Sequence, residues 1–185
     1  MDQRKAEAND NGTILRIDQR WVPLSHIPEH VRMAVLVAED RAFFSHTGVD
    51  WHEVREALED NLEEGRIVRG GSTITQQLAK NLYLSTSKDP IRKFKELLIT
   101  WMLENSLSKQ RILELYLNVI EWGPGVFGVE AAAQRYFHKP ASELTLNEGV
   151  RLAAVIPRPL HYRPTDDNNY VRKKTQWILK RMPNR

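Results

Sequence analysis

The feature that most constrains the fold is the repeated pairing of a helix-start signal with an apolar stripe of helical period. Capping-box spacings, in which a side-chain acceptor is followed three residues later by an acid or an amide, occur at Asp50 and Glu53, Thr73 and Gln76, and Thr145 and Glu148. Asp89 precedes Pro90, which suits an N-cap followed by the first helical position. These side chains satisfy the free amides of a helix start. The chain is therefore predicted to be mainly α-helical.

The predicted helices cover most of the chain, and extended structure is expected only in "TILRIDQRWVPL", residues 13–24. The helices are predicted from Pro28 to about Asp40, from Asp50 to Gly65, from Thr73, from Pro90, from Ser108, over Val129–Phe137, from Thr145 to Pro157, and around Val171 to Met182. In the helix that starts at Pro90, Ile91, Phe94, Leu98 and Trp101 share one face. Apolar residues at this period are typical of a core-facing stripe, so we expect them to be buried.

The composition indicates one folded domain. The chain has 185 residues, of which 41% are hydrophobic, enough for one well-filled core. It contains no repeat, low-complexity tract or long linker, so we expect a polar tail over residues 1–12 and a single domain over 13–185. The absence of cysteine excludes disulfide and thiolate chemistry.

Charge and hydropathy narrow the possible partners. The formal net charge is only +3, which argues against a dedicated nucleic-acid binder but permits an anionic substrate or membrane surface. The longest apolar run, Met33–Ala38, is far shorter than the roughly 20 residues that a spanning helix needs. The polar start of the chain has no signal-peptide core. As written, the chain is expected neither to cross a membrane nor to carry an export signal.

Three polar segments are candidates for chemistry, and the first is "AEDRAFFSHTGVD", residues 38–50. Glu39 and Asp40 follow an apolar helix, where an ionised acid gains little from the helix macrodipole. One interpretation is a solvated helix end, with His46 and Asp50 as turn formers. The other is a site whose environment is arranged for acid–base chemistry.

The second segment is "RGGSTITQQLAKNLYL", where two glycines precede Ser72 and Thr73. The glycines allow close backbone approach, and the amides of a helix start favour an anion. Gln76 and Lys80 lie four residues apart, on one helical face. A capped amphipathic helix explains the caps but not two glutamines and a lysine beside a glycine pair. A Walker-type loop is excluded, because no glycine-lysine-serine pattern is present.

The third segment is "KDPIRKFKELL", in which Arg92 and Glu96 lie four residues apart. Taken alone, this pair is a surface ion pair worth a few tenths of a kcal/mol. Read with the other two segments, it completes a set of two carboxylates, a lysine, an arginine and anion-ready amides. That set suits displacement of an anionic leaving group by a hydroxyl.

Five ordered stretches, "EDRAFFSHTGVD", "GGSTITQQLAKN", "RKFKE", "RILELYLNVIEWGPGVFGVEAAAQRYF" and "LAAVIPRP", resemble the motifs of the peptidoglycan glycosyltransferase family (family 51 glycosyltransferases). The resemblance covers Trp21 to about Met182, and "GVFGVEAAAQRYFHKPAS" is close to the monofunctional biosynthetic type. It implies a mainly α, lysozyme-like helical domain with a small membrane-facing jaw lobe. It also implies inverting polymerisation of lipid II, the activity that moenomycin-type inhibitors block.

The resemblance also implies roles for individual residues. Glu39 matches the catalytic base that deprotonates the sugar hydroxyl of incoming lipid II, and Glu96 matches a second catalytic-site glutamate that either orients groups or binds a divalent cation. The implied substrate-binding residues are Asp40, Ser72, Thr73, Gln76, Gln77, Lys80, Asn81, Lys88, Arg92 and Lys93.

The resemblance implies no obligatory cofactor. A magnesium or manganese ion held by Glu96 is the option it leaves open, and the six scattered histidines argue against zinc. The implied partners are lipid II, the lipid-linked glycan strand, the membrane surface and other cell-wall synthesis proteins, with no nucleic acid. The expected location is the outer face of a bacterial plasma membrane, with peripheral attachment partly through Arg66 and Arg69.

Two residues depart from the family pattern. Lys88 stands where the family usually has arginine, and Arg151 lies in a usually apolar part of the fifth motif. Two other functions remain open at this point. A lysozyme-like glycan hydrolase or lytic transglycosylase would use a catalytic glutamate but would not need Lys80 and Arg92. A non-catalytic helical module that docks on membranes or partner helices would tolerate replacement of Glu39 and Glu96.

Overall fold

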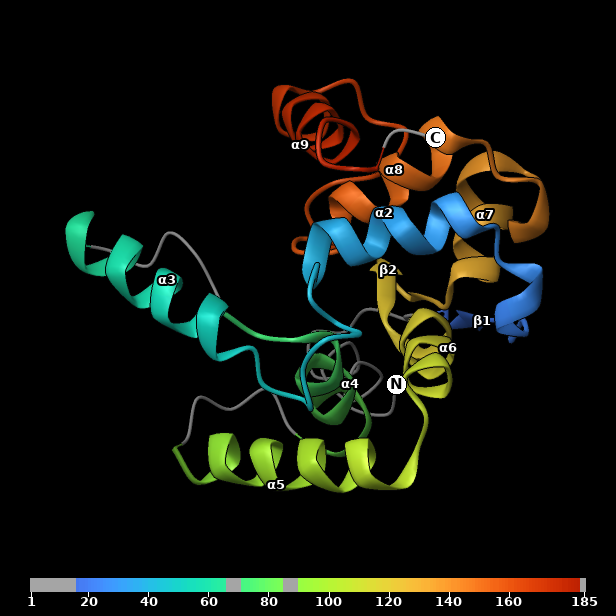
Figure 1. The fold of residues 1–185 in the computed structure, drawn as a ribbon. Coiled ribbons are helices and arrows are strands. Elements are labelled where there is room, and N and C mark those ends of the chain that lie inside the picture. The colour runs from blue at the N-terminus through green and yellow to red at the C-terminus, as the bar shows by residue number, and fades with distance from the viewer. Residues whose placement is uncertain (1–15, 66–70, 85–89, 184–185) are drawn as a thin grey trace. The chain divides into compact units, whose positions relative to one another are not determined.

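The structure is a computed structural model that describes residues 16–65, 71–84 and 90–183. Within these ranges it is mainly α-helical, as the helix-start signals predicted (Figure 1). The elements are β1 (Asp18–Gln19), η1 (Leu24–His26), α2 (Glu29–Glu39), α3 (Trp51–Glu63), α4 (Ile74–Tyr83), α5 (Pro90–Ser106), α6 (Lys109–Val119), β2 (Glu121–Gly123), β3 (Val126–Phe127), α7 (Val129–Phe137), η2 (Ala141–Glu143), α8 (Leu146–Val155) and α9 (Asn169–Leu179). The chain forms two compact units, one of Met1–Ala38 with Glu114–Arg185 and one of Glu39–Leu113.

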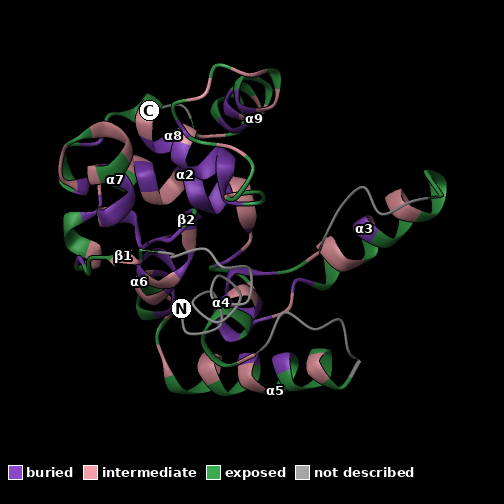
Figure 2. Cartoon of the chain, turned by 180° about the vertical axis from the view of Figure 1, so that it is seen from behind, coloured by how far each residue is buried: buried purple, intermediate pink, exposed green. Residues whose placement is uncertain are grey.

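The first unit has an apolar core in which α2, α7 and α8 contribute most of the buried side chains. Figure 2 shows α2 and α8 largely buried. Helices α2 and α8 cross closely at Gly149, where an added Cβ would lie 2.8 Å from Val31 Cγ2. Helix α9 packs against α8 and buries Val171 and Ile178. This unit follows the rule that the apolar stripe of a helix faces the core.

A short sheet completes the first unit. Its strand order is β1-β3-β2, with β1 parallel and β2 antiparallel to β3. The fully buried Asn118 ties β1's downstream segment to α6: its side chain donates to the Val22 carbonyl at 2.9 Å and accepts from the Val22 amide at 2.8 Å. Extended structure was predicted for residues 13–24, and among the described part of that stretch only Asp18–Gln19 forms a strand.

Arg151 has a structural explanation that its apolar neighbourhood in the sequence did not supply. Its Nε donates to the Pro164 carbonyl at 2.5 Å and its Nη2 donates to the Asp166 carbonyl at 2.6 Å. The arginine on α8 therefore fixes the turn that leads into α9. Backbone carbonyls in a turn have no partner from a helix or strand, so the Arg151 side chain supplies the hydrogen-bond donors that these two carbonyls lack.

The second unit is built around α4, which packs against α5. Both predicted capping-box starts in this unit are confirmed. Asp50 caps α3 by accepting from the amides of His52 and Glu53, and Thr73 with Gln76 forms a reciprocal capping box on α4. Helix α4 buries Ile74, Thr75, Gln76, Leu78 and Ala79, so its first turn is polar as well as buried.

The predicted burial of the α5 stripe is wrong. Phe94 is 69% exposed and Trp101 is 61% exposed, and Ile91, Leu98 and Met102 on the same helix are also exposed. The buried positions of α5 are instead polar, with Glu96 4% and Thr100 1% exposed. The period correctly indicated a shared face for the apolar side chains, but that face points away from the unit's interior.

Candidate active site

The candidate base, Glu39, is the last residue of α2. The residues before it, Val35, Leu36 and Val37, are buried, and Glu39 itself is half-buried. Gln77 on α4 donates from Nε2 to Glu39 Oε2 at 2.8 Å. A helix end is an unfavourable place for an isolated carboxylate, because the carbonyl end of the macrodipole repels negative charge. The amide of Gln77 offsets this repulsion and fixes the orientation of the carboxylate.

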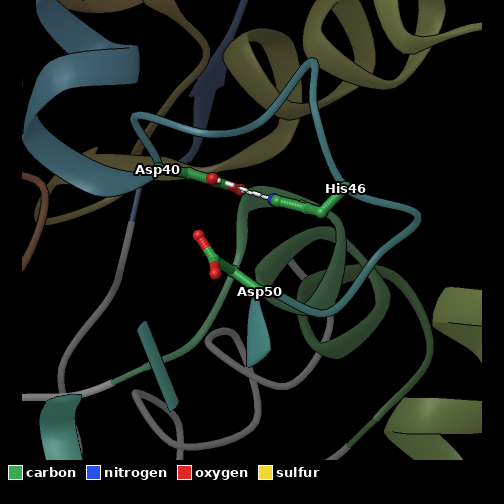
Figure 3. Close-up of side chains that lie close together, drawn as sticks. All are labelled: Asp40, His46 and Asp50. Carbon is green, nitrogen blue, oxygen red and sulfur yellow. Dashed lines mark hydrogen bonds and ion pairs between the residues drawn. The ribbon is translucent and has the colours of Figure 1, made fainter. Parts of the chain in front are cut away.

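Asp40, next to Glu39, lies close to His46 and Asp50, and it is hydrogen-bonded to His46 (Figure 3). Asp40 is 7% exposed; it pairs with His46 Nε2 at 3.0 Å and accepts from the Ile74 amide at 2.9 Å. The Gly48 amide donates to His46 Nδ1 at 3.1 Å, so in the neutral ring Nδ1 is the acceptor and Nε2 carries the proton. His46 therefore donates to Asp40 and holds it against the start of α4.

The start of α4 is fixed by hydrogen bonds from both sides. Thr73 Oγ1 donates to the Gly48 carbonyl at 2.6 Å and accepts from the Gln76 amide at 3.2 Å. Gln76 Oε1 in turn accepts from the Thr73 amide at 3.1 Å, and both residues are buried. Gly48 has φ +96°, and an added Cβ would lie 2.7 Å from Thr100 Cγ2. Only glycine therefore suits this turn, in conformation and in space.

The second candidate acid, Glu96, is paired with two cations on its own helix. Arg92 Nη1 donates to Glu96 Oε2 at 2.9 Å, and Lys93 Nζ donates to Oε1 at 2.6 Å. The Glu96 side chain is 5% exposed, whereas that of Lys93 is 47% exposed. Arg92 Nε is buried and has no hydrogen-bond partner among the described residues. The surface pair that the spacing suggested is thus a largely buried cluster with one unused donor.

The remaining predicted site residues lie in different settings. Ser72 and Lys80 are exposed, and Asn81 donates its side-chain amide to the Gln77 carbonyl at 2.8 Å. Lys88 falls outside the described residues, as do Arg66 and Arg69. The structure therefore joins Glu39 to Gln77, Asp40 to the start of α4, Thr73 to Gln76, and Glu96 to Arg92 and Lys93.

Sequence reasoning missed a buried acid, Glu104, on the inner side of α5. Its Oε1 accepts from Thr75 Oγ1 at 2.5 Å and from Lys109 Nζ at 2.8 Å. Lys109 Nζ also lies 4.5 Å from the centre of the buried Phe43 ring, a cation–π contact. The network ties α4, α5, α6 and the loop after Glu39 together. No local sequence pattern predicts the burial of Glu104, because an acid within a helix usually faces solvent.

The residues present do not fit a divalent metal well. Glu96 already carries a guanidinium and an ammonium on its two oxygens, and these positive charges oppose a further cation. In the Asp40–His46–Asp50 cluster, the ring nitrogen that faces Asp40 carries a proton, and the Asp50 carboxylate caps α3. Metal ligation would require His46 to give up that proton and its hydrogen bond.

This geometry supplies an oriented carboxylate and a separate set of cations in one unit. Glu39 is oriented by the Gln77 amide, and a carboxylate is a group that can accept a proton from a hydroxyl. Arg92 and Lys93 can offset negative charge, and the Glu96 carboxylate holds them in place. A carboxylate and cations in one unit are the groups that transfer with an anionic leaving group would use.

Comparisons with known proteins agree with this chemistry. A transglycosylase family model matches residues 9–183. A biosynthetic peptidoglycan transglycosylase of Laribacter hongkongensis is 45% identical over 182 residues, which span 98% of this chain and 80% of the relative. Relatives of the same description in Dechloromonas aromatica and Ralstonia nicotianae are 47% identical over 180 residues and 55% identical over 143 residues; these matches span 97% and 77% of this chain and 78% and 61% of the two relatives.

The chain belongs to the transglycosylase family. The resemblance that the five motifs indicated is thereby confirmed, as is the mainly α fold.

Proposed function

We propose that the chain polymerises peptidoglycan glycan strands from lipid II. In this reaction the sugar hydroxyl of incoming lipid II attacks the anomeric carbon of the lipid-linked glycan, inverts it, and expels the lipid diphosphate. The observation that carries the proposal is the Glu39–Gln77 pair at the end of a buried helix, in a chain that belongs to the transglycosylase family. The names of the relatives support the same activity.

Glu39 acts as the general base in this proposal. The proton of the attacking hydroxyl passes to the carboxylate as the new glycosidic bond forms. Gln77 positions the carboxylate through Oε2, and Asp40 fixes the neighbouring backbone through His46 and the Ile74 amide. The base is thus held by contacts from two directions, which keeps it in place before substrate arrives.

Arg92, Lys93 and Lys80 bind the departing diphosphate. The guanidinium of Arg92, whose side chain is 19% exposed, meets a phosphate oxygen, while its Nη1 stays on Glu96. An arginine held in this way meets a phosphate without first being ordered, which lowers the cost of binding. Glu96 therefore acts as a positioning residue for the cations, and no step requires a metal.

A glycan hydrolase of lysozyme-like fold is the rival enzyme. It would need a carboxylate pair beside the glycosidic bond, with one acid kept protonated. The second buried acid, Glu96, instead has an arginine on one oxygen and a lysine on the other, so both oxygens are already engaged by cations. The relatives' description as biosynthetic also favours polymerisation over hydrolysis.

We further propose that the second unit docks on the outer surface of a bacterial plasma membrane through α5. Ile91, Phe94, Leu98 and Trp101 form its exposed apolar face. Each large apolar side chain left in water forgoes about 1.5–3 kcal/mol of burial, so such a face is typical of an interaction site. Among the described residues, no helix is both long and apolar enough to span a bilayer. Peripheral contact through α5 brings the unit to a lipid-linked substrate.

Labelled lipid II tests the proposed activity when the products are separated by size. The protein should convert labelled lipid II into long labelled strands. It should not lengthen preformed glycan when lipid II is left out. Release of short fragments from preformed glycan would establish the hydrolase instead. Flotation with phospholipid vesicles tests the docking surface, and Phe94→Ser with Trp101→Ser should reduce the bound fraction. The exposed pair Arg16→Ser and Arg20→Ser is the control.

A further inference from the structure

The charge of this chain is unevenly distributed along the sequence. Residues 158–185 hold eight of the 27 lysines and arginines but only two of the 24 acids, a net charge of +6. The rest of the chain therefore carries −3. Within that region, α9 contains no acid at all. A concentration of one sign attracts an anionic partner over a distance of about a Debye length, roughly 8 Å at physiological ionic strength.

The cations of α9 lie on its solvent side. Arg172, Lys173 and Lys180 are exposed, whereas Val171 and Ile178 on the opposite side are buried in the first unit. From residue 172 to residue 180 a helix rises about 12 Å at 1.5 Å per residue, so these charges form an elongated row. We call these three exposed cations, with Lys174 and Arg181 beside them, the α9 basic surface.

Two of these cations are held in place by an aromatic ring. Lys174 Nζ lies 4.4 Å and Arg181 Cζ 4.2 Å from the centre of the Trp177 ring. Cation–π contact restricts long side chains that would otherwise be free to rotate. Part of the entropy of ordering these cations is therefore lost before any anion binds, which favours binding.

The neighbouring acids do little to neutralise this surface. Asp167 lies 3.9 Å from Arg172 Nε, but its side chain is 83% exposed, so the pair is weak in water. Asp166 is engaged by the amide of Arg163 and the side chain of Asn168. The exposed Arg172, Lys173 and Lys180 thus face solvent, where an external anion can reach them.

We propose that the α9 basic surface binds the carboxylate-bearing peptides of the uncrosslinked glycan strand as the strand grows. This inference rests on the proposed polymerase activity, whose product is an extended polyanion. An elongated row of cations matches an extended chain of carboxylates better than it matches a single small anion. The contact holds the product near the enzyme between additions and so lengthens the strands.

An anionic membrane is a poorer match for the same surface. A helix that binds at a lipid interface inserts an apolar face between the headgroups. In α9 that face, with Val171, Thr175 and Ile178, is buried against the rest of the first unit. The exposed apolar stripe belongs to α5, on the other unit. The two helices therefore offer different chemistries for different partners.

The test compares two triple variants in a binding assay with purified uncrosslinked glycan strands from bacterial cell walls. One variant is Arg172→Glu, Lys173→Glu and Lys180→Glu. The matched control is Arg16→Glu, Arg20→Glu and Arg135→Glu, which changes three exposed cations of the same unit by the same net charge. Thermal unfolding midpoints check that both variants fold. Because the strands are made beforehand, binding is measured whether or not the chain polymerises lipid II.

The α9 variant should bind strands about tenfold more weakly or worse, the scale on which a field of one sign alters association. The control should bind like the parent chain, and removing the peptides with an amidase should abolish binding. In the lipid II assay the α9 variant should make shorter strands at an unchanged initial rate. Equal weakening of both variants, or undiminished binding to peptide-free glycan, would overturn the proposal. Loss of binding to anionic vesicles with strand binding intact would assign the surface to lipid instead.

Discussion

Helices α8 and α5 both carry many apolar side chains. Helix α8 buries most of them in the core, whereas α5 leaves most of them exposed. Helix α8 buries Val150 and Leu152, and its acid, Glu148, lies at the partly exposed first turn. Helix α5 does the reverse, with Glu96 buried and Phe94 and Trp101 exposed. The first arrangement stabilises a fold in water. The second places a carboxyl group with its two cationic partners inside and an apolar surface outside, which is useful only if the unit handles charge and meets an apolar partner.

The difference teaches where stability and function separate in this molecule. Apolar burial in the first unit stabilises the fold without requiring that each buried side chain find a hydrogen-bond partner. In the second unit, each buried polar group needs a partner, and Asp40, Thr73, Thr75 and Glu96 all have one. Such a network is costly to disturb, because removing one member leaves another unsatisfied. Substitutions in the first unit should therefore mainly change stability, whereas substitutions in the second unit should mainly change activity.

Replacing the base should produce the largest effect on activity. Glu39→Gln keeps the side-chain volume but removes the charge, so polymerisation should fall by about 10²–10⁴-fold, the typical value of a positioned general base. The unfolding temperature should stay close to that of the parent chain, because Glu39 is a half-buried helix-terminal residue. Turnover in the lipid II assay measures this, and activity within a few-fold of the parent would remove Glu39 from the role.

The guanidinium on α5 should come next. Arg92→Ala removes the donor proposed for the diphosphate, and turnover should fall by about 10²-fold, as for loss of one preorganised charge-stabilising group. Lys95→Ala is the control, since it removes an exposed cation of the same helix. Steady-state kinetics on lipid II compare the two. If the two variants lose the same small fraction of activity, the cations of α5 act only through the general field.

A pair of large-to-small substitutions tests the contrast between α8 and α5 directly. Leu152→Ala should lower the free energy of unfolding by about 2–5 kcal/mol, because it opens a cavity in the core. Phe94→Ser should change the free energy of unfolding by about 0.5 kcal/mol or less, since surface substitutions rarely do more. Urea denaturation without lipid measures both. A large loss for Phe94→Ser would mean that the stripe of α5 packs against protein.

The smallest expected effect concerns the two capping boxes. Burial acts to raise the pKa of Glu148, but the amide and hydroxyl of Thr145 and the ammonium of Lys139 lower it below its ordinary 4.5. A depressed carboxylate stabilises the fold above its unfolded pKa, and this stability is lost as the pH falls through the folded value. The box on α4 has the neutral Gln76 instead and should show no such dependence.

Glu148→Gln makes the α8 box resemble the α4 box. The variant should unfold at a lower temperature than the parent near pH 7, and the gap should narrow as the pH falls below about 4.5. Thermal unfolding at pH 7 and pH 3.5 measures the gap. An equal gap at both values would show that the charge of Glu148 contributes nothing to the α8 cap.

Local signals predicted much of the secondary structure and part of the site. The capping residues Asp50, Thr73 and Thr145 placed three helix starts, because an N-cap depends on side chains within a few residues. The end of α2 was predicted at about Asp40, and the helix ends one residue earlier, at Glu39. The Arg92–Glu96 contact also followed from spacing alone, since residues four apart on a helix are neighbours.

The sequence by itself determined which side chains share a helix face, but only the tertiary structure decided what each face meets. Periodicity cannot distinguish an apolar stripe that packs on protein from one that is left exposed, and α5 has the second kind. The Glu104–Thr75–Lys109 network joins three helices, so no local window contains it. The protonated nitrogen of His46 is likewise set by the Gly48 amide and by Asp40, through a turn that forms only when the loop folds back on α5. Contacts between distant segments assign these roles, because the free energy of a buried polar group depends on the partners that folding places beside it.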